Sequence, residues 1–322
     1  MQNKLVSIAM CTYNGERYIK EQLESILNQT YSNLEIIISD DCSNDATIDI
    51  IKHYQKADSR IKLFINKQNL GFVKNFENVI SLCNGEYIAL ADQDDIWKKN
   101  KIEKFILEIK DNILIYSDAI LIDDKSRKTD LQLIRPHNLL CKGKCSKSLL
   151  LYNVVSGNTM MFHKNLVQYI LPIHPNMNYH DSWIAFVATN YSTITYTDEP
   201  MTYYRRYSEQ ITHKQNKKTK NILTKIKYKT IQKNNNANLR YRELTALKSL
   251  SILNDLSTIK IIDSLILHYK NYESIIFNFH LYNLLKQYKN DIFATLPYKK
   301  RNKAAFRLAK GLRLHIYTAH LL

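Results

Sequence analysis

The sequence predicts an α/β fold with a mostly parallel central sheet, followed by an α-helical C-terminal region. Over the first two hundred residues, short apolar runs alternate with amphipathic segments of roughly ten residues, which is typical of parallel strands joined by helical crossovers. From residue 239 to residue 288, by contrast, Leu and Ile recur at helical spacing without Pro or Gly. That second pattern favours one or two long helices.

The individual elements follow from their periodicity. Strands are expected where apolar residues run together between turn signals, at 5–10, 34–38, 61–65, 87–90, 113–117 and 193–196. Helices are expected where apolar residues recur at helical spacing, as Ile19, Leu23 and Ile26 do; these segments are 16–29, 47–55, 73–82, 98–110 and 180–189. The polar stretch 118–147 is expected to be a loop over the site, and a strand at 154–162 is broken at Gly157.

Charge divides the chain into two parts. The whole chain carries a net charge of +16, yet residues 214–322 alone contain 22 Lys and Arg against 5 Asp and Glu. We therefore expect two domains, 1–213 and 214–322, and a polyanionic surface as a partner of the second. An anionic membrane surface, nucleic acid, and a helical domain that packs on the first domain or forms a homo-oligomer are the three interpretations. No nucleic-acid-binding motif is recognisable, so no nucleic acid is expected.

Two further observations concern the cellular compartment. The chain has no apolar segment long enough for a signal peptide or for a membrane span, and its five cysteines are scattered. Cys141, Cys145 and His137 have no standard zinc-finger spacing and lack a fourth ligand. We expect a cytoplasmic protein without a zinc site.

Three carboxylates, Asp92, Asp94 and Asp95, follow directly after the apolar run 87–90. Open α/β sheets bind their ligands at the carboxyl ends of the strands, which is where these acids are expected to lie. Carboxylates this close repel one another unless a cation or hydrogen-bond donors offset their charge. The alternative to a ligand-binding role is a solvated turn that caps the helix starting near Lys98.

Four motifs occur in a specific order: Cys-Thr-Tyr-Asn-Gly-Glu at 11–16, Asp-Asp-Cys-Ser-Asn-Asp at 40–45, Asn-Leu-Gly at 69–71 and Asp-Gln-Asp-Asp-Ile-Trp at 92–97. Together they resemble the family 2 glycosyltransferases, and their wording is similar to the bacterial rhamnosyltransferase-like branch. The resemblance covers about residues 4–212. It implies the GT-A fold, a Rossmann-like sandwich that binds a nucleotide-sugar.

By this resemblance, the first three motifs bind the nucleotide and the fourth binds the metal. The residues implied to line the nucleotide pocket are Thr12, Tyr13 and Asn14. Asp41 is implied to accept a hydrogen bond from the base, and its alternative role is an N-cap of the next helix. Asp92 is implied to lie near the ribose or the metal, and Asp94 to coordinate Mn²⁺ or Mg²⁺. The cation would offset charge on the departing nucleoside diphosphate.

The resemblance also implies an acceptor side. His180-Asp181-Ser182-Trp183 lies where the family carries its catalytic acid, so Asp181 is the expected catalytic base, with an N-cap as the alternative. We interpret His180 as a surface histidine or a neighbour that tunes Asp181. Gly157, Asn158 and Trp183 are the other expected acceptor-side residues.

The sequence departs from the family at Tyr204-Arg205-Arg206-Tyr207, where relatives carry His at the last position. A protonated tyrosine is a poor ligand for Mg²⁺ or Mn²⁺, so Tyr207 is not expected to serve as the third protein ligand, and His213 is a candidate substitute. Arg205 remains an expected partner of the donor diphosphate, because guanidinium binds phosphate oxygens in a bidentate manner.

These residues predict an inverting glycosyltransferase. The expected donor is deoxythymidine-diphosphate-rhamnose or a uridine-diphosphate hexose, and the expected acceptor is a hydroxyl of a bacterial surface glycan or lipid-linked oligosaccharide. Its expected location is the cytoplasmic face of the plasma membrane, as a peripheral protein. The alternatives are a non-catalytic nucleotide-sugar-binding scaffold and a sugar-phosphate nucleotidyltransferase. The segment 11–15 lacks the Gly-rich phosphate loop usual in the latter class.

Overall fold

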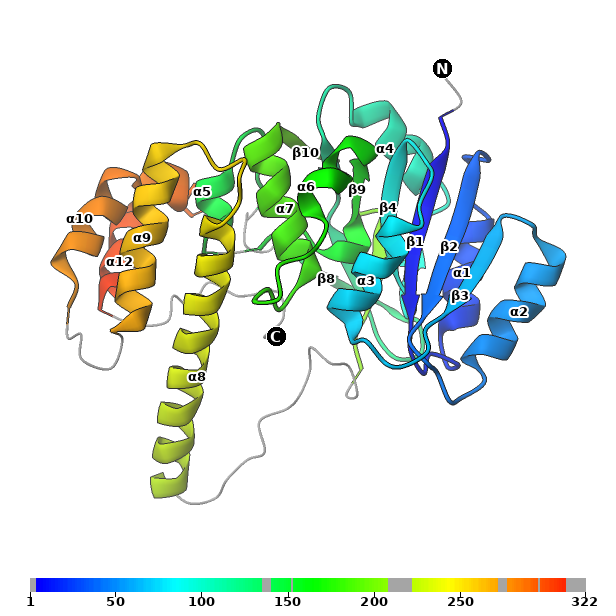
Figure 1. Cartoon of the computed structure of the whole chain (residues 1–322), viewed down its shortest axis with the longest axis horizontal. Helices are drawn as coiled ribbons and strands as arrows, with labels where there is room; N and C mark the ends of the chain where they lie inside the picture. The colour runs from blue at the N-terminus through cyan, green and yellow to red at the C-terminus, as the bar shows by residue number, and fades with distance from the viewer. Residues whose placement is uncertain are drawn as a thin grey trace.

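The computed structural model describes residues 4–134, 140–151, 153–207, 222–271, 277–294 and 296–310, with the side chains of 222–234 excepted. The chain forms an α/β body at one end and a group of helices at the other (Figure 1). Strands β1, β2 and β4 stand side by side in the body. Helices α9, α10 and α12 lie at the opposite end (Figure 1).

A seven-stranded sheet forms the centre of the body, in the order β10-β6-β9-β4-β1-β2-β3. Its strands are β1 (Val6–Thr12), β2 (Leu34–Asp40), β3 (Ile61–Ile65), β4 (Tyr87–Asp92), β6 (Leu114–Tyr116), β9 (Met160–His163) and β10 (Ile194–Tyr196). All neighbours pair in parallel except β9, which runs antiparallel to both β4 and β6. The mostly parallel sheet expected from the alternating pattern is confirmed.

Helices cover both faces of this sheet. They are α1 (Ile19–Leu27), α2 (Thr47–Ala57), α3 (Phe72–Ser81), α4 (Lys101–Glu108), α6 (Val167–Ile170) and α7 (His180–Tyr191). Strand β1 shows the reason: Ile8 and Met10 pack into the cluster that contains α1 and α4, whereas Ala9 packs into the cluster of α3 and α7. Successive strand residues point to opposite faces, so a strand that is buried along its whole length requires a helical layer on each side.

A second, four-stranded sheet has the order β5-β11-β7-β8 and was not expected from the sequence. It contains β5 (Ile96–Trp97), β7 (Ala119–Ile122), β8 (Lys128–Gln132) and β11 (Thr202–Arg205). The loop predicted over 118–147 is therefore wrong in its first part. These strands are short, and β8 is polar and mostly exposed; apolar periodicity gives no signal for such a strand.

The C-terminal region is helical, as predicted. Its helices are α8 (Ile222–Lys248), α9 (Leu256–Lys270), α10 (Phe279–Gln287), α11 (Lys289–Ile292) and α12 (Tyr298–Ala309), and α11 contacts α5 (Ser146–Leu149) of the body. Leu244, Ile261 and Leu285 belong to the same apolar cluster as the α7 residues. The two parts thus share one core. The boundary predicted after residue 213 falls outside the described residues. No described helix is long and apolar enough to cross a membrane.

Candidate functional site

The loops after β1 and β2 are joined by hydrogen bonds in both directions. The Asn14 backbone N–H donates to Ser43 Oγ at 2.9 Å, and the Asn44 N–H donates to Asn14 Oδ1 at 2.9 Å. The Gly15 N–H donates to Thr47 Oγ1 at 2.7 Å. Asn14 has a φ of 47°, a left-handed conformation that Asn tolerates better than most residues. The two motifs that begin at residues 11 and 40 therefore form one continuous rim.

Gln93 connects this rim to the acidic motif. Its side-chain amide accepts a hydrogen bond from the Tyr13 N–H at 2.8 Å and donates to the Tyr13 carbonyl at 3.0 Å. A Cβ at Gly15 would lie 2.2 Å from Gln93 Oε1, so a larger residue at this position would displace the Gln93 side chain from the rim. Thr12 is buried, and Tyr13 is 45% exposed on the rim.

The two aspartates of the second motif have structural partners within the protein. Asp40 accepts from Thr12 Oγ1 at 2.6 Å and from Ser43 Oγ at 2.7 Å. Asp41 is buried and accepts from the backbone N–H groups of Leu70 and Gly71, at 2.8 and 2.9 Å. Asp41 therefore holds the 69–71 turn, and the alternative role as N-cap of α2 is wrong because Ala46 occupies that position. Contact with a base stays a prediction.

Asp92 ends β4 and is partly buried. Burial, followed by the charges of Asp94 and Asp181, raises the pKa of Asp92 to about 7. Asp95 is completely buried and accepts hydrogen bonds from Asn158 Nδ2 and from the Arg205 backbone N–H. The alternative interpretation, a solvated turn that caps the next helix, is wrong for Asp95. Asp95 is buried, and Asn100 occupies the N-cap position of α4.

The donor set of the acidic motif fits a hard divalent cation. Within the described ranges, no three His, Cys, Asp or Glu side chains are grouped so that they could hold a metal ion. Mg²⁺, however, commonly uses only one or two carboxylates together with substrate phosphates. The repulsion between Asp92 and Asp94 that raises the Asp92 pKa is the charge that such a cation would offset. Asp94 Oδ2 accepts from the Tyr207 hydroxyl at 2.8 Å. His213 lies outside the described residues.

A buried lysine beneath the acidic motif was not predicted. Lys101 is completely buried, donates to the Asn158 carbonyl at 2.7 Å and to Thr202 Oγ1 at 3.0 Å, and lies 3.6 Å from the Trp97 ring centroid. Burial lowers its pKa strongly, while Asp95 and Asp92 oppose that shift. A signal was available, since Lys101 precedes Ile102 and Phe105 on the apolar face of the predicted helix 98–110.

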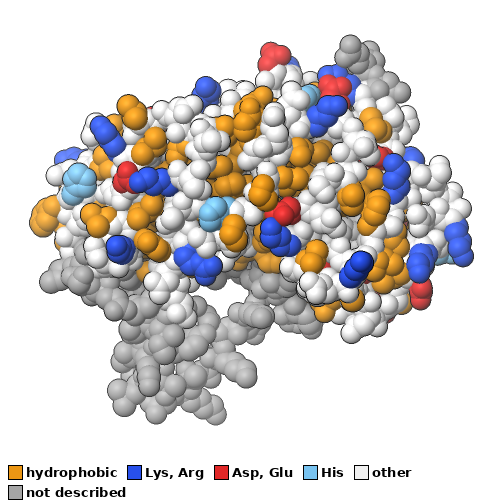
Figure 2. Space-filling view, in the orientation of Figure 1, with side chains coloured by type: hydrophobic (Ala, Val, Ile, Leu, Met, Phe, Trp, Pro, Cys, Tyr) orange, Lys and Arg blue, Asp and Glu red, His pale blue; other side chains and the backbone are white. Residues whose placement is uncertain are grey.

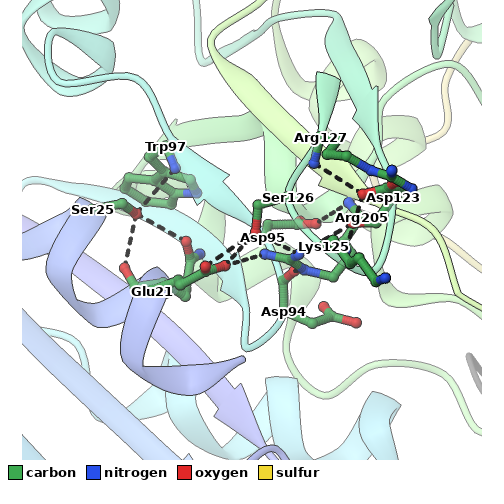
Figure 3. Close-up of polar contacts among 11 residues, drawn as sticks. Glu21, Ser25, Asp94, Asp95, Trp97, Asp123, Lys125, Ser126, Arg127 and Arg205 are labelled. Atoms are coloured by element: carbon green, nitrogen blue, oxygen red, sulfur yellow. Dashed lines mark hydrogen bonds and ion pairs between the residues drawn. The ribbon is translucent and has the colours of Figure 1, made fainter. Parts of the chain in front are cut away.

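Arg205 lies inside the protein rather than facing an open diphosphate site. Its guanidinium is fully buried and donates to the Asp94 carbonyl, the Asp123 carbonyl and Ser126 Oγ, at 2.8, 3.2 and 2.9 Å, and it pairs with the Glu21 carboxylate. Figure 3 shows this network between α1, the β7–β8 turn and the acidic motif, with the Asp94 carboxylate pointing away from it. The geometry favours a positioning role for Arg205 instead of the expected phosphate contact.

Asp181 lies in the first turn of α7 and is 6% exposed. Its Oδ1 accepts from the Ser182 N–H at 2.6 Å. It also lines a pocket, whose other lining residues are Leu133, Ile134, Asn153, Val154, Ser156 and Tyr204. Tyr179, not Asp181, is the N-cap residue of α7. Asp181 therefore borders a pocket, and its negative charge contributes to the raised pKa of Asp92.

The expected acceptor-side residues Gly157, Asn158 and Trp183 are all buried. Trp183 donates from Nε1 to the Ile170 carbonyl at 2.8 Å and belongs to the apolar core, so the prediction that it faces an acceptor is wrong. Asn158 supports Asp95 from below. Gly157 opens the 3₁₀ turn η2 (Gly157–Thr159), where a Cβ would lie 2.7 Å from His180 Nε2.

His180 is a buried histidine, not a surface one. Its ring stacks on Phe76 with centroids 3.9 Å apart, and neither ring nitrogen has a hydrogen-bond partner among the described residues. Burial lowers the pKa of His180 to about 4, opposed by the charge of Asp181. The neutral ring fills the space between α3 and the Gly157 turn, and thereby braces the start of α7 next to Asp181.

The fold and the convergence of acidic loops at the strand ends define a protein of the GT-A class. The solved structure of Staphylococcus aureus TarS residues 1–349 in complex with UDP-GlcNAc superposes with a TM-score of 0.58, at 16% identity, over 96% of this chain and 88% of that one. The mannosyltransferase PcManGT of Pyrobaculum calidifontis, in complex with GDP-Man and Mn²⁺, gives a TM-score of 0.50 at 14% identity, over 84% and 82% of the two chains. At these identities the likeness concerns the fold.

Sequence comparison gives the family. Residues 7–170, half of the chain, match the family model "Glycosyl transferase family 2", and the chain belongs to this family. An uncharacterized glycosyltransferase of Haemophilus influenzae is 35% identical over 173 residues, 50% of this chain and 52% of that protein. The Escherichia coli protein named UDP-Glc:alpha-D-GlcNAc-diphosphoundecaprenol beta-1,3-glucosyltransferase WfgD is 38% identical over 128 residues, 39% and 50% of the two chains. The chain thus spans about half the length of such relatives.

Proposed function

We propose that the protein is an inverting glycosyltransferase that moves a sugar from a nucleoside diphosphate to a hydroxyl group of a bacterial glycan. One observation carries the proposal. Asp92 ends β4 in the acidic motif, and Asp181, nearly ninety positions further along the chain, lines a pocket at the start of α7, where its charge acts on Asp92. A carboxylate that can bind a metal and a second carboxylate at a pocket that can accept a proton are the two charged groups that such a transfer requires.

The rim formed by the loops after β1 and β2 is the donor side. Thr12, Tyr13 and Asn14 would line the nucleotide, and Asp41 would face its base. Asp92 and Asp94 would hold Mn²⁺ or Mg²⁺, which supplies Lewis-acid stabilisation of the departing diphosphate. Arg205 would fix the backbone of Asp94 through its 2.8 Å hydrogen bond and so keep the carboxylate on the donor side.

Asp181 would act as the base. The acceptor hydroxyl oxygen attacks the anomeric carbon, the bond from that carbon to the phosphate oxygen breaks, and the hydroxyl proton passes to the Asp181 carboxylate. Attack on the face opposite the leaving group inverts the anomeric configuration. Gly157 and Asn158 would shape the acceptor side from beneath, because Gly157 leaves room for His180 and Asn158 supports Asp95.

The acceptor and the location belong to the same proposal. The name of WfgD specifies a lipid-linked acceptor, GlcNAc-diphosphoundecaprenol. We extend this chemistry to the present chain, which would act as a peripheral protein at the cytoplasmic face of the plasma membrane. The donor would be deoxythymidine-diphosphate-rhamnose or a uridine-diphosphate hexose. The Asp-Gln-Asp-Asp-Ile-Trp motif favours the first.

A calorimetric and thermal-shift panel of nucleoside diphosphates and nucleotide-sugars, with and without Mn²⁺ or Mg²⁺, tests the proposal. A ligand that binds only the folded state raises the melting temperature with its concentration. Metal-dependent binding of a thymidine or uridine compound is the expected result. Hydrolysis or transfer assays with the compound that binds then separate an enzyme from a scaffold. If no compound of the panel binds, with or without a metal ion, the proposal is contradicted.

A further inference from the structure

An aromatic cluster lies on the surface of the C-terminal helices. Phe277 contacts the rings of Phe279, Tyr282 and Phe306 with centroids 4.7, 5.7 and 5.2 Å apart. Phe279 is nevertheless 73% exposed and Phe306 is 46% exposed. These rings join α10 to α12, but two of them present large apolar faces to solvent instead of a core. Apolar patches of this kind mark interaction sites.

Basic side chains border the same rings. Lys299, Lys303 and Phe306 on α12 and Lys310 at its C-cap follow one another at spacings of four, three and four residues, so they form one stripe of the helix surface. All four side chains are exposed. We name this stripe together with Phe279 the α10–α12 surface.

Acidic residues are scarce around this surface. Neither α10 nor α12 contains Asp or Glu, and residues 277–310 contain eight Lys and Arg against the single acid Asp291. Figure 2 shows basic and apolar side chains interspersed over the end of the molecule where α9, α10 and α12 lie in Figure 1. Lys299 and Lys303 have no carboxylate partner among the described ion pairs. The charge is therefore open to an external anion.

We propose that the α10–α12 surface docks the protein on an anionic lipid bilayer. A helix surface that combines exposed aromatic rings with neighbouring lysines suits the interface between headgroups and acyl chains. Lysine stems lie along apolar surface while their ammonium groups reach outward to the phosphates. Phe279 and Phe306 enter the interface, and the lysines bind the anionic headgroups. This deepens the membrane association in the proposed function by naming the surface that makes it.

The shared core of the body and the C-terminal helices requires that the full chain be used in the test. Wild-type protein is sedimented with vesicles of phosphatidylcholine that contain no or 30% phosphatidylglycerol, a mixture chosen for the assay. Binding is expected only to the anionic vesicles. Lys299→Gln/Lys303→Gln should weaken it about 25-fold, since each charge near the surface is worth about 1 kcal/mol, or roughly fivefold.

The matched control is Lys52→Gln/Lys56→Gln on α2, which removes the same charge at the same spacing from another exposed helix. This control should bind like the wild type. An equal loss in both double variants would overturn the proposal, because it would show a response to net charge and not to this surface. Absence of wild-type sedimentation at low salt would overturn it as well.

A second arm tests the aromatic rings. Phe279→Ser/Phe306→Ser should remove the part of the binding that survives 0.5 M salt, whereas Phe64→Ser on β3, where Phe64 is 40% exposed, should leave it unchanged. Circular dichroism melting checks that each variant is folded. Lipid binding is read without any sugar donor, so this proposal and the proposed sugar transfer can fail independently of each other.

Discussion

The proposed donor side and the proposed acceptor side of the candidate site are held together by different interactions. On the donor side, loops after neighbouring parallel strands exchange hydrogen bonds between side chains and backbone, as Asn14 does with Ser43 and Asn44. On the acceptor side, buried side chains from distant segments fill space: His180 stacks on Phe76, and Asn158 lies under Asp95. Polar loops adjust to a ligand more easily than a packed core does.

This difference has a functional consequence. Substitutions on the donor side should mainly change donor affinity, because they loosen a rim that the nucleotide itself can help to order. Substitutions on the acceptor side should mainly change turnover, because they displace Asp181 in a core that cannot relax. The following variants test this division, beginning with the substitution that should change activity most.

Asp181→Asn should lower turnover about 10³-fold, roughly 4 kcal/mol in the activation barrier, because the amide cannot take the acceptor proton. Donor binding measured by calorimetry should stay within twofold of the wild type. Asp49→Asn, the same substitution on the exposed face of α2, serves as the control and should retain full turnover. Equal activity of both variants would favour the scaffold interpretation.

The buried neutral His180 should make stability depend on pH. Its pKa is about 4 in the folded state against an ordinary value of 6.5. As the pH falls from 6.5 to 4, the unfolded chain takes up a proton that the folded protein refuses, so the folded state loses up to about 3 kcal/mol. The difference in the free energy of unfolding between wild type and His180→Phe measures this loss.

The comparison also controls for Asp92. Wild type and His180→Phe both contain Asp92, so its titration contributes equally to the stability of the two proteins. Its raised pKa acts in the opposite sense, as stability is lost when the pH rises from about 4 to about 7. In the difference this contribution cancels. A difference that does not change between pH 6.5 and pH 4 would mean that His180 is solvated.

Gly157→Ala should lower turnover about tenfold and destabilise the protein by about 2 kcal/mol, since overpacking a core typically costs 1–3 kcal/mol. The cause is the added Cβ, 2.7 Å from His180 Nε2. Turnover is measured in a transfer assay, and the free energy of unfolding is measured by chemical denaturation. The double variant Gly157→Ala/His180→Ala removes the clash, and it should recover stability relative to the sum of the single variants.

Gln93→Ala should raise the dissociation constant of the donor about tenfold and leave turnover at saturation nearly unchanged. It removes two hydrogen bonds to the Tyr13 backbone, at 2.8 and 3.0 Å, each worth about 0.5–1.5 kcal/mol. Gln93→Glu keeps the acceptor oxygen but places a second carboxylate oxygen against the Tyr13 carbonyl, so it should not restore the affinity of the wild type. A loss of turnover without a loss of affinity would contradict the division between the two sides.

The amino-acid sequence alone predicts the alternating strands and helices of the body, the helical C-terminal region and the place of the acids at the end of β4. These are local properties, since apolar periodicity and turn residues are read within a window of ten residues or so. The family resemblance was equally local, because its four motifs lie in loops between neighbouring elements. The loops' positions at the strand ends follow from the parallel order of the strands.

Tertiary structure alone decided the rest. In the four-stranded sheet, β11 pairs with β5 and β7, from which it is separated by more than a hundred and more than eighty residues, and these segments carry little periodicity. Whether Trp183, Arg205 and His180 face a ligand or the core depends on what packs against them, and all three are buried. The residue type defines which interactions a polar or aromatic side chain can make. Only its neighbours in space decide whether solvent and substrate can reach it.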